Sequence, residues 1–334
     1  MIRFGIIGFG YWGPNVARNV MAMQEATLEM ICDSDPDALK RCKAMYRHVT
    51  LTNDADAILK SKSIDVVAVV TPVATHFEIA QKALENGKHV FVEKPFTRTA
   101  KEAQTLIDLA EKKKLKIMVD HVFIFTGAVR KIKELIDQDK MGHLYYYDSL
   151  RSSLGLFRPD VNVIWDLAPH DFSILDYLFE NKLVGVSAQG LDHMGRGYEN
   201  MAYITGYFEN KCMAHISVNW LSPVKIRTIL IGGEKSMLVW DDLLTDEKIK
   251  VYDKGVTIKN KEGSYRLMVD YRSGDMWSPR VDPTEALTVE LNYFVDCIKK
   301  DKDPINDGHS GLRVVKMLTA TTESLKKKGK MIKV

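Results

Sequence analysis

The chain has 334 residues, 46% hydrophobic and 27% charged, which is the composition of an ordinary soluble globular protein and the length of two domains. Its 47 Lys and Arg residues nearly balance 44 Asp and Glu residues, so the formal charge of +3 gives no support to a nucleic-acid-binding surface. We expect a reduced, cytoplasmic protein without metal, nucleic-acid or membrane partners, because the four cysteines lack metal-ligand spacing and no apolar run resembles a secretory signal or membrane span.

The first predicted element is a buried strand over residues 2–7, followed at once by three glycines and a helical pattern. The spacing Gly8-x-Gly10-x-x-Gly13 is typical of a dinucleotide pocket, in which the glycines allow a tight turn, the approach of a pyrophosphate and close packing of helix on strand. The phosphates would lie on free N–H groups at the helix start. The residues predicted to bind the cofactor here are Gly8, Phe9, Gly10, Tyr11, Trp12 and Gly13.

Asp33 ends the next apolar run, residues 28–32, and lies 25 positions after Gly8 (33 minus 8). This is close to the offset of roughly 20 residues expected for the acid that binds the ribose hydroxyls. No arginine follows immediately to receive a phosphate, so NAD is favoured over NADP. The alternative is an ordinary βαβ unit with a glycine turn and a solvent-facing Asp33.

Strands alternate with helices as far as about residue 121, with further strands predicted at residues 64–70, 89–92 and 115–119. This alternation predicts a parallel sheet covered on both faces, with ligands at the carboxyl ends of its strands. Polar or glycine residues occupy each of those ends. To the cofactor we therefore also assign Thr71, Pro72, His76, Glu93, Lys94 and His121.

From about residue 122 the composition changes to longer alternating strands that turns join as antiparallel neighbours. The predicted elements are a connecting helix at 127–137, a helix at 167–179, strands at 145–150, 201–208, 212–220, 225–232 and 236–241, and two amphipathic helices in the C-terminal tail. The least regular stretch, residues 254–283, is interpreted as a surface excursion in preference to a substrate or subunit loop.

Glu93-Lys94-Pro95 ends one of the predicted parallel strands beside the cofactor. A partly desolvated lysine there has a lowered pKa and can transfer a proton or hold a substrate oxygen. A surface lysine before a helix-starting proline explains the pattern equally well.

A second group of candidate residues is Trp165-Asp166-Leu167-Ala168-Pro169-His170-Asp171. Pro169 fits the first turn of a helix, which places His170 near the helix start and Asp166 just before it. In a helical turn Asp166 and His170 share a face, and the helix dipole and the carboxylate influence the imidazole in opposite directions. Such a histidine suits removal of a hydroxyl proton as hydride leaves carbon. A capping Asp and a structural His are the alternative.

With these residues together, the chain resembles the Gfo/Idh/MocA oxidoreductase family over essentially its whole length. The motifs that carry the resemblance are Gly8 to Gly13, Thr71-Pro72 to His76, Glu93-Lys94-Pro95 and Asp166-x-x-x-His170. The resemblance implies an α/β fold with an N-terminal, doubly wound Rossmann sheet and a C-terminal α+β domain whose open, mainly antiparallel sheet forms a homodimer or homotetramer. We therefore expect an NAD-binding domain at 1–122 and a substrate-binding and oligomerisation domain at 123–334, with the C-terminal helix able to pack back on the first.

The resemblance also implies site residues and a substrate. Lys94, Asp166 and His170 correspond to the family's catalytic residues, and Lys94-Pro95 is expected to be cis. Motifs near residues 10–15, 156–160 and 165–171 are similar to a subgroup that includes UDP-N-acetylglucosamine and UDP-N-acetylglucosaminuronate 3-dehydrogenases. The residues predicted to contact the substrate are Lys94, Arg151, Arg158, Asn162, Trp165, Asp166 and His170.

The leading hypothesis is therefore NAD-dependent oxidation at C3 of a UDP-linked amino sugar or its uronate. Arg151 and Arg158 favour such an anionic substrate, although arginines on a loop are often only solvated. A dehydrogenase of a free sugar or inositol would use the same residues. A non-catalytic NAD-binding sensor is the alternative of another class, and it leaves the combination of Lys94, Asp166 and His170 unexplained.

Overall fold

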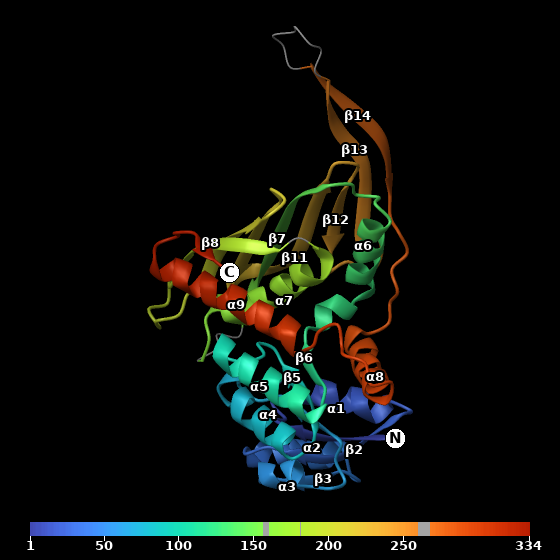
Figure 1. The fold of residues 1–334 in the computed structure, drawn as a ribbon, viewed down its shortest axis with the longest axis vertical. Coiled ribbons are helices and arrows are strands. Elements are labelled where there is room, and N and C mark those ends of the chain that lie inside the picture. Colours follow the sequence, from blue (N-terminus) through green and yellow to red (C-terminus); the bar gives the residue numbers. More distant parts are fainter. Residues whose placement is uncertain (156–159, 181, 260–267) are drawn as a thin grey trace. The chain divides into compact units, whose positions relative to one another are not determined.

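The computed structural model describes residues 1–155, 160–180, 182–259 and 268–334 (Figure 1). The chain forms two compact units. The first contains Met1–Phe125 and Thr284–Thr319, and the second contains Thr126–Pro283 and Ala320–Val334. Each unit is built around its own sheet and is described by itself.

The first unit contains a six-stranded sheet in the order β3-β2-β1-β4-β5-β6, in which every neighbouring pair is parallel. Its strands are β1 (Ile2–Ile7), β2 (Ala26–Cys32), β3 (Thr50–Thr52), β4 (Val66–Val69), β5 (His89–Glu93) and β6 (Ile117–Asp120). The strand order reverses between β1 and β4, which is where a doubly wound sheet opens a crevice for ligands at its carboxyl end. The predicted Rossmann sheet is thus confirmed.

Helices cover this sheet on both faces. They are α1 (Gly13–Ala22), α2 (Pro36–Met45), α3 (Ala55–Leu59), α4 (His76–Glu85), α5 (Ala100–Lys113), α8 (Ala286–Lys299) and the first part of α9 (Gly308–Lys326), with short 3-10 turns at η1 (Val73–Thr75) and η2 (Val122–Phe125). On one face Val67 and Val90 join a buried core with residues of α3, α4 and α5. On the other face the ring of Phe91 lies 6.3 Å from that of Phe294 in α8.

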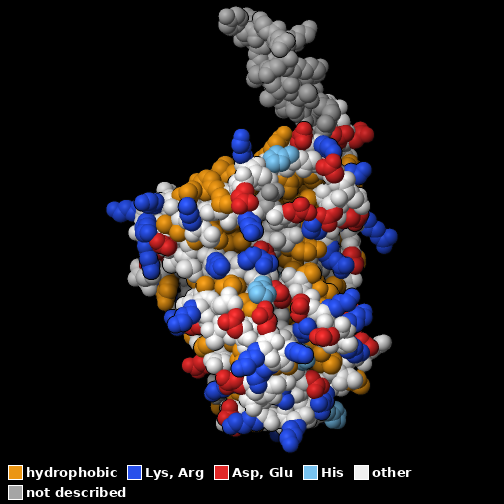
Figure 2. Space-filling view, in the orientation of Figure 1, with side chains coloured by type: hydrophobic (Ala, Val, Ile, Leu, Met, Phe, Trp, Pro, Cys, Tyr) orange, Lys and Arg blue, Asp and Glu red, His pale blue; other side chains and the backbone are white. Residues whose placement is uncertain are grey.

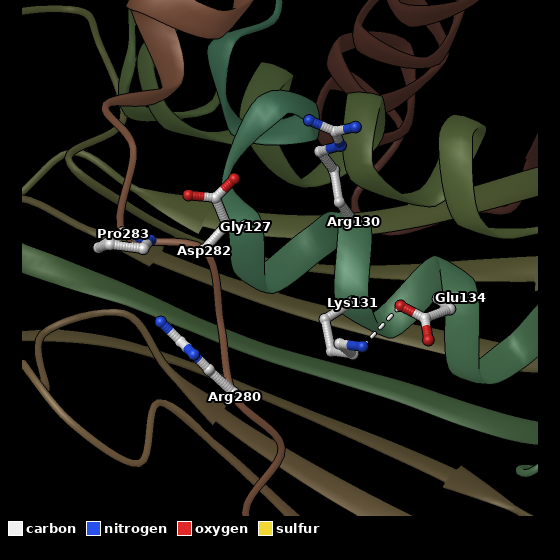
Figure 3. A pocket seen from close by; sticks show the side chains of 7 residues that line it. All are labelled: Gly127, Arg130, Lys131, Glu134, Arg280, Asp282 and Pro283. Carbon is white, nitrogen blue, oxygen red and sulfur yellow. Dashed lines mark hydrogen bonds and ion pairs between the residues drawn. The ribbon is translucent and has the colours of Figure 1, made fainter.

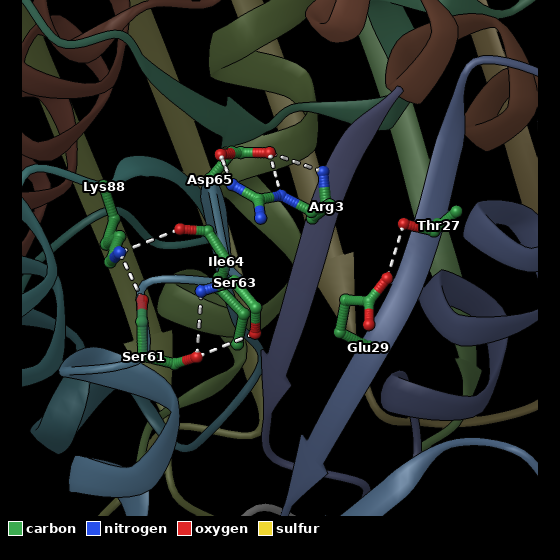
Figure 4. Close-up of polar contacts among 8 residues, drawn as sticks. All are labelled: Arg3, Thr27, Glu29, Ser61, Ser63, Ile64, Asp65 and Lys88. Carbon is green, nitrogen blue, oxygen red and sulfur yellow. Dashed lines mark hydrogen bonds and ion pairs between the residues drawn. The ribbon is translucent and has the colours of Figure 1, made fainter.

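Polar contacts fix the amino ends of the strands in the first unit (Figure 4). The Arg3 guanidinium donates to both carboxylate oxygens of Asp65, at 2.9 and 2.7 Å. These hydrogen bonds lower the pKa of Asp65. Lys88 donates to the carbonyl oxygens of Ser61 and Ile64, at 2.6 and 2.8 Å. Side chains of the unit itself therefore fill the amino end of the sheet, and we expect ligands to bind at the carboxyl end.

The second unit contains a nine-stranded sheet in the order β14-β13-β12-β11-β7-β10-β9-β8-β15. Its strands are β7 (Leu144–Leu154), β8 (Leu183–Leu191), β9 (Met201–Phe208), β10 (Met213–Asn219), β11 (Leu221–Gly233), β12 (Met237–Asp241), β13 (Ile249–Lys259), β14 (Met268–Trp277) and β15 (Ile332–Lys333). Only β7 and β10 pair in parallel, so the predicted mainly antiparallel sheet is confirmed.

The two helices that follow the first unit directly, α6 (Gly127–Asp137) and α7 (Val163–Leu178), belong to this sheet's unit. Helix α7 packs on β9 and β10, and it also contacts α6. The inward residues of β9 and β10, among them Ile204 and Ile216, are buried, whereas Tyr203 and Met213 on the alternate face are 47% and 48% exposed. One face of the sheet is thus covered by helix and the other is open within the unit.

Two predictions about this unit were wrong. Helix α7 begins at Val163 and not at residue 167, because the Asn162 side chain accepts a hydrogen bond from the Trp165 N–H at 3.1 Å and caps the helix earlier. Pro169 accordingly lies inside the helix and not in its first turn. The stretch 254–283, the least regular in sequence, contributes to strands β13 and β14, and its residues 273–278 are exposed.

The surface in Figure 2 carries basic and acidic side chains interspersed over both units, with hydrophobic side chains between them. Such a mixed surface on this face gives no single-sign field for a polyanion. Among the helices of the described ranges, none combines the length and the apolar character that crossing a bilayer requires.

Candidate active site

The glycine turn after β1 has three glycines with three different surroundings. Gly8 has φ +103°, and a β carbon there would lie 2.4 Å from the Val70 carbonyl oxygen. A β carbon on Gly13 would lie 2.4 Å from the Gly8 carbonyl oxygen, whereas one on Gly10 would meet nothing within 4 Å. The first and third glycines are therefore required by the protein itself. The open side of Gly10 is the approach that a pyrophosphate needs.

Asp33 is bound to this turn. Its carboxylate accepts from the N–H groups of Phe9, at 2.5 Å, and Asp35, at 2.8 Å. Helix α1 starts next to it with Trp12 as N-cap and no side-chain cap. Pro14 has no N–H and the Asn15 N–H donates to the Trp12 carbonyl, which leaves the Gly13 N–H at the helix start for an anion. Together with the open side of Gly10, these residues fit a bound dinucleotide.

The other residues of the turn contribute in different ways. Phe9 is 1% exposed and its ring lies edge-on to Tyr46 at 6.2 Å, so only its backbone can face a ligand. Tyr11 is 74% exposed. The Trp12 indole N–H donates to the Asp120 carboxylate at 2.6 Å. The turn is thereby tied to the end of β6, at the far edge of the sheet.

The residues assigned to the cofactor after β4 form a brace behind the strand ends. Thr71 and Pro72 follow β4, and His76 is buried with Nδ1 2.9 Å from the Pro95 carbonyl and Nε2 2.8 Å from the Thr71 carbonyl. Burial lowers the pKa of His76, against the effect of the two carbonyls. His76 thus joins the end of β4 to the Lys94-Pro95 peptide, which is cis as expected.

The strand end that carries Lys94 lies next to two acids, the half-buried Glu93 and the buried Asp120. Glu93, the last residue of β5, pairs in register with Asp120, the last residue of β6. Lys94 is half-buried, and its charge lowers the pKa of Asp120 against the larger effect of burial. His121, predicted to bind the cofactor, is 1% exposed and lies within the body of the unit. Asp120 was not predicted to be functional, although its position at a strand end was the available signal.

In the second unit, Asp166 and His170 lie one turn apart on α7 and therefore on one face of the helix. Trp220, buried at 2% exposure, donates its indole N–H to Asp166 Oδ2 at 3.2 Å. Asp166 and His170 are both half-buried. The pair thus combines a carboxylate held by an indole with an imidazole four residues on, which is a suitable arrangement for proton transfer.

Three other residues predicted to contact the substrate make hydrogen bonds within the second unit. Arg151 is buried and donates its Nε–H to Asp171 Oδ2 at 3.0 Å. Asn162 caps α7, and the Trp165 indole N–H donates to Thr322 Oγ at 2.9 Å. Each of the three side chains therefore makes a contact that stabilises the second unit. Arg158 lies outside the described residues.

A pocket of about 620 Å³ lies elsewhere in the second unit, between α6 and the segment before residue 284 (Figure 3). Its lining residues are Gly127, Arg130, Lys131, Glu134, Arg280, Asp282 and Pro283. Lys131 is held by Glu134 at 2.6 Å. None of the predicted site residues lines this pocket.

Comparison with known proteins covers both units. Residues 2–121 match the oxidoreductase family model with an NAD-binding Rossmann fold, and residues 133–334 match that family's C-terminal α/β domain. A scyllo-inositol 2-dehydrogenase (NAD(+)) from Bacillus subtilis is 25% identical, covering 91% of this chain and 88% of its own. A UDP-N-acetylglucosamine 3-dehydrogenase from Acidithiobacillus ferrooxidans is 26% identical, covering 94% of each chain.

A solved structure of UDP-N-acetylglucosamine 3-dehydrogenase from Acidithiobacillus ferrooxidans has a TM-score of 0.79 to this chain, with 23% identity and 98% coverage of each chain. This similarity establishes the fold. The two family models account for nearly all of the sequence and agree with the two sheets described above. The chain belongs to the Gfo/Idh/MocA family of oxidoreductases, and its first unit is the family's NAD-binding Rossmann domain.

Proposed function

We propose that the protein transfers hydride between NAD and a carbon that bears a hydroxyl group on a sugar, and that this carbon is C3 of a UDP-linked N-acetylamino sugar or its uronate. The observation that carries the proposal is the Asp166 and His170 pair on one face of α7, with Asp166 held by Trp220. The UDP-N-acetylglucosamine 3-dehydrogenase relative, matched over 94% of the chain, supports the choice of sugar.

The proposed roles follow from the chemistry of an alcohol that loses a hydride and a proton. NAD, held by the turn around Gly10 and by Asp33, supplies the hydride acceptor. His170 accepts the hydroxyl proton, Asp166 orients the imidazole, and Lys94 holds or relays through the same oxygen. In the reverse direction His170 returns the proton to the forming hydroxyl.

A free cyclitol or sugar is the second candidate substrate. The scyllo-inositol 2-dehydrogenase relative, matched over 91% of the chain, favours it. It would need the same proton-transfer residues but no recognition of a diphosphate. A non-catalytic NAD-binding protein would need neither His170 nor Asp166.

A screen of NAD reduction over UDP-sugars, UDP-sugar uronates and free cyclitols tests these alternatives. The expected result is turnover of a UDP-N-acetylamino sugar or its uronate, seen as absorbance of reduced nicotinamide. Turnover of a free cyclitol with no response to any nucleotide sugar would replace the preferred substrate by the second candidate. Dinucleotide binding with no turnover of any of these compounds would favour the non-catalytic alternative.

We also propose that the protein forms a homodimer or homotetramer through the open face of the second sheet. Leu150, Tyr203 and Met213, which lie on three adjacent strands, are 38%, 47% and 48% exposed on that face. The ring of Tyr203 stacks on His215 with a centroid distance of 6.1 Å. Aromatic and apolar side chains gathered on one face are typical of a buried subunit contact.

A further inference from the structure

Two acidic side chains lie near each other inside the first unit. Asp120 at the end of β6 is 2% exposed, and Glu290 in α8 is 0% exposed. Asp120 Oδ1 and Glu290 Oε2 are both buried without a hydrogen-bond donor in the described part of the chain, and each carboxyl group shifts the pKa of the other. A proton carried by one of the two carboxyl groups would satisfy both oxygens. Among the residues that the structure describes, no group of acids, histidines and cysteines is arranged to hold a metal ion.

The contacts around the pair identify its two ends. On the β6 side, Asp120 Oδ2 accepts the Trp12 indole N–H at 2.6 Å. On the α8 side, Glu290 Oε1 accepts from Asn306 Nδ2 at 2.8 Å. Asn306 Nδ2 also donates to the Val119 backbone carbonyl at 2.6 Å, and the Asn306 backbone carbonyl accepts from the Val119 N–H at 2.9 Å. The loop before α9 therefore clamps β6, the edge strand, directly beside the pair.

The surrounding charges place the proton on Glu290. Burial raises the pKa of both groups, and the charges of Asp120 and Glu93 raise that of Glu290 further. The hydrogen bond from Trp12 and the charge of Lys94 both favour ionised Asp120. Besides the two acids themselves, the charged groups that shift their pKa values are Glu93 and Lys94.

We propose that Glu290 is a positioning residue, which stays protonated and donates a hydrogen bond to the Asp120 carboxylate. Through Asp120 it fixes the Trp12 indole, and with it the start of α1 where the dinucleotide pyrophosphate binds. Its chemical requirement is a neutral hydrogen-bond donor, and not a negative charge. This deepens the proposed function, on which it depends only for the NAD site.

Replacing Glu290 by Gln and by Ala separates these requirements. The glutamine side chain has nearly the same shape and a permanent hydrogen-bond donor, so Glu290→Gln should bind NAD with wild-type affinity. Glu290→Ala removes the donor and should weaken NAD binding by about tenfold or more, equivalent to ~1.4 kcal/mol or more. Affinity is measured by equilibrium titration of NAD alone, which needs no sugar substrate. Loss of NAD binding in Glu290→Gln, or wild-type affinity in Glu290→Ala, would overturn the proposal.

The pH dependence of the free energy of unfolding provides a second test. If Glu290 only filled space, Glu290→Gln would not change this pH dependence. A group whose pKa is raised on folding loses its contribution to stability as pH rises through the folded-state pKa. Glutamine does not titrate, so Glu290→Gln should become progressively more stable than wild type as pH rises above about 4.3, the ordinary pKa of Glu. A gap that is constant with pH would contradict a protonated Glu290.

Glu285, at the start of the same helix, provides the matched control. The hydrogen bond from Arg18 lowers the pKa of Glu285, so the stability that Glu285 contributes should change with pH in the opposite direction to that of Glu290. Glu285→Gln should therefore lose stability relative to wild type at neutral pH, and the gap should close as pH falls through the folded-state pKa of Glu285. If wild type binds NAD but turns over no sugar, the proposed function fails while the role of Glu290 is still tested by these titrations.

Discussion

At the scale of single residues, Gly10 and Gly13 differ in what a methyl group would meet. A β carbon on Gly10 has nothing within 4 Å. Gly10→Ala should therefore leave the thermal midpoint of unfolding unchanged, because no contact in the unit is disturbed. It should weaken NAD binding by about tenfold or more, or ~1.4 kcal/mol, because the methyl group occupies the approach of the pyrophosphate. Calorimetric titration with NAD and a thermal melt measure the two effects separately.

Gly13→Ala is the contrasting variant, since its β carbon would lie 2.4 Å from the Gly8 carbonyl oxygen. It should lower the unfolding midpoint even without NAD. If Gly10→Ala bound NAD as tightly as wild type, the pyrophosphate could not lie against Gly10. Other residues of the turn would then have to bind it.

His170 and Lys94 are tested by their separate effects on turnover and on NAD binding. Removing a proton-transfer group should lower kcat on the order of a hundredfold or more. His170→Ala and Lys94→Ala should each do so, and in His170→Ala the NAD affinity should stay near wild type. His143, an exposed histidine of the second unit, is the control, and His143→Ala should keep full turnover. Full turnover in His170→Ala would remove His170 from the mechanism.

At the scale of elements, helix α7 is braced against β7 by a buried charged cluster. Asp171 is 0% exposed and accepts hydrogen bonds from Tyr147, Ser149 and Arg151, at 3.1, 2.6 and 3.0 Å. Burial opposes the Arg151 charge, but Asp171 outweighs it and raises the Arg151 pKa. Because Asp171 follows His170 directly, the cluster fixes the part of the helix that presents the histidine.

Asp171→Ala should destabilise the protein by about 3–5 kcal/mol, because it leaves the Arg151 charge buried without its carboxylate. Ser149→Ala removes only one neutral hydrogen-bond donor from the same cluster and should cost about 1 kcal/mol. Chemical denaturation, followed by a signal that reports the second unit, measures the difference. Equal losses in the two variants would mean that the ion pair contributes nothing beyond an ordinary hydrogen bond.

The elements that could be predicted from sequence are those whose own pattern determines them. Strands such as β4 are β-branched runs buried on both faces, and the glycine spacing before α1 has few other uses. The start of α7 could not be predicted, because the Asn162 cap competes with the strong but local signal of Pro169. The edge strand β14 and its neighbour β13 carry charged residues that obscure the alternation of half-buried strands.

The site residues that could be predicted are likewise those that stand in a local sequence motif, and contacts between residues far apart in the sequence could not be predicted. Lys94, Asp166 and His170 stand in recognisable motifs, whereas the ion pair between Arg151 and Asp171 could not be known from the sequence. Asp120 and Glu290 are 170 residues apart (290 minus 120), and neither has a local pattern that reveals their pairing. Contacts of this kind follow from the fold and cannot be read from neighbouring residues.

At the scale of the whole molecule, assembly through the open face of the second sheet can be tested at Tyr203. The side chain is 47% exposed and stacks on His215 in the adjacent strand. Tyr203→Lys would place a charge within a subunit contact, where an unpaired charge is strongly disfavoured. Light scattering on the eluting peak should therefore show an oligomer for wild type and a smaller species for the variant.

Met45→Lys provides the control, since Met45 is 61% exposed at the end of α2 in the first unit and lies outside the proposed contact. That variant should keep the wild-type mass, which shows that an added surface lysine does not by itself disrupt assembly. A wild-type protein that is monomeric at micromolar concentration would contradict assembly through this sheet. In a two-fold contact the substituted lysine would be present on both subunits and should disrupt the contact. Retention of the full oligomer in Tyr203→Lys would therefore mean that the subunits meet through another surface.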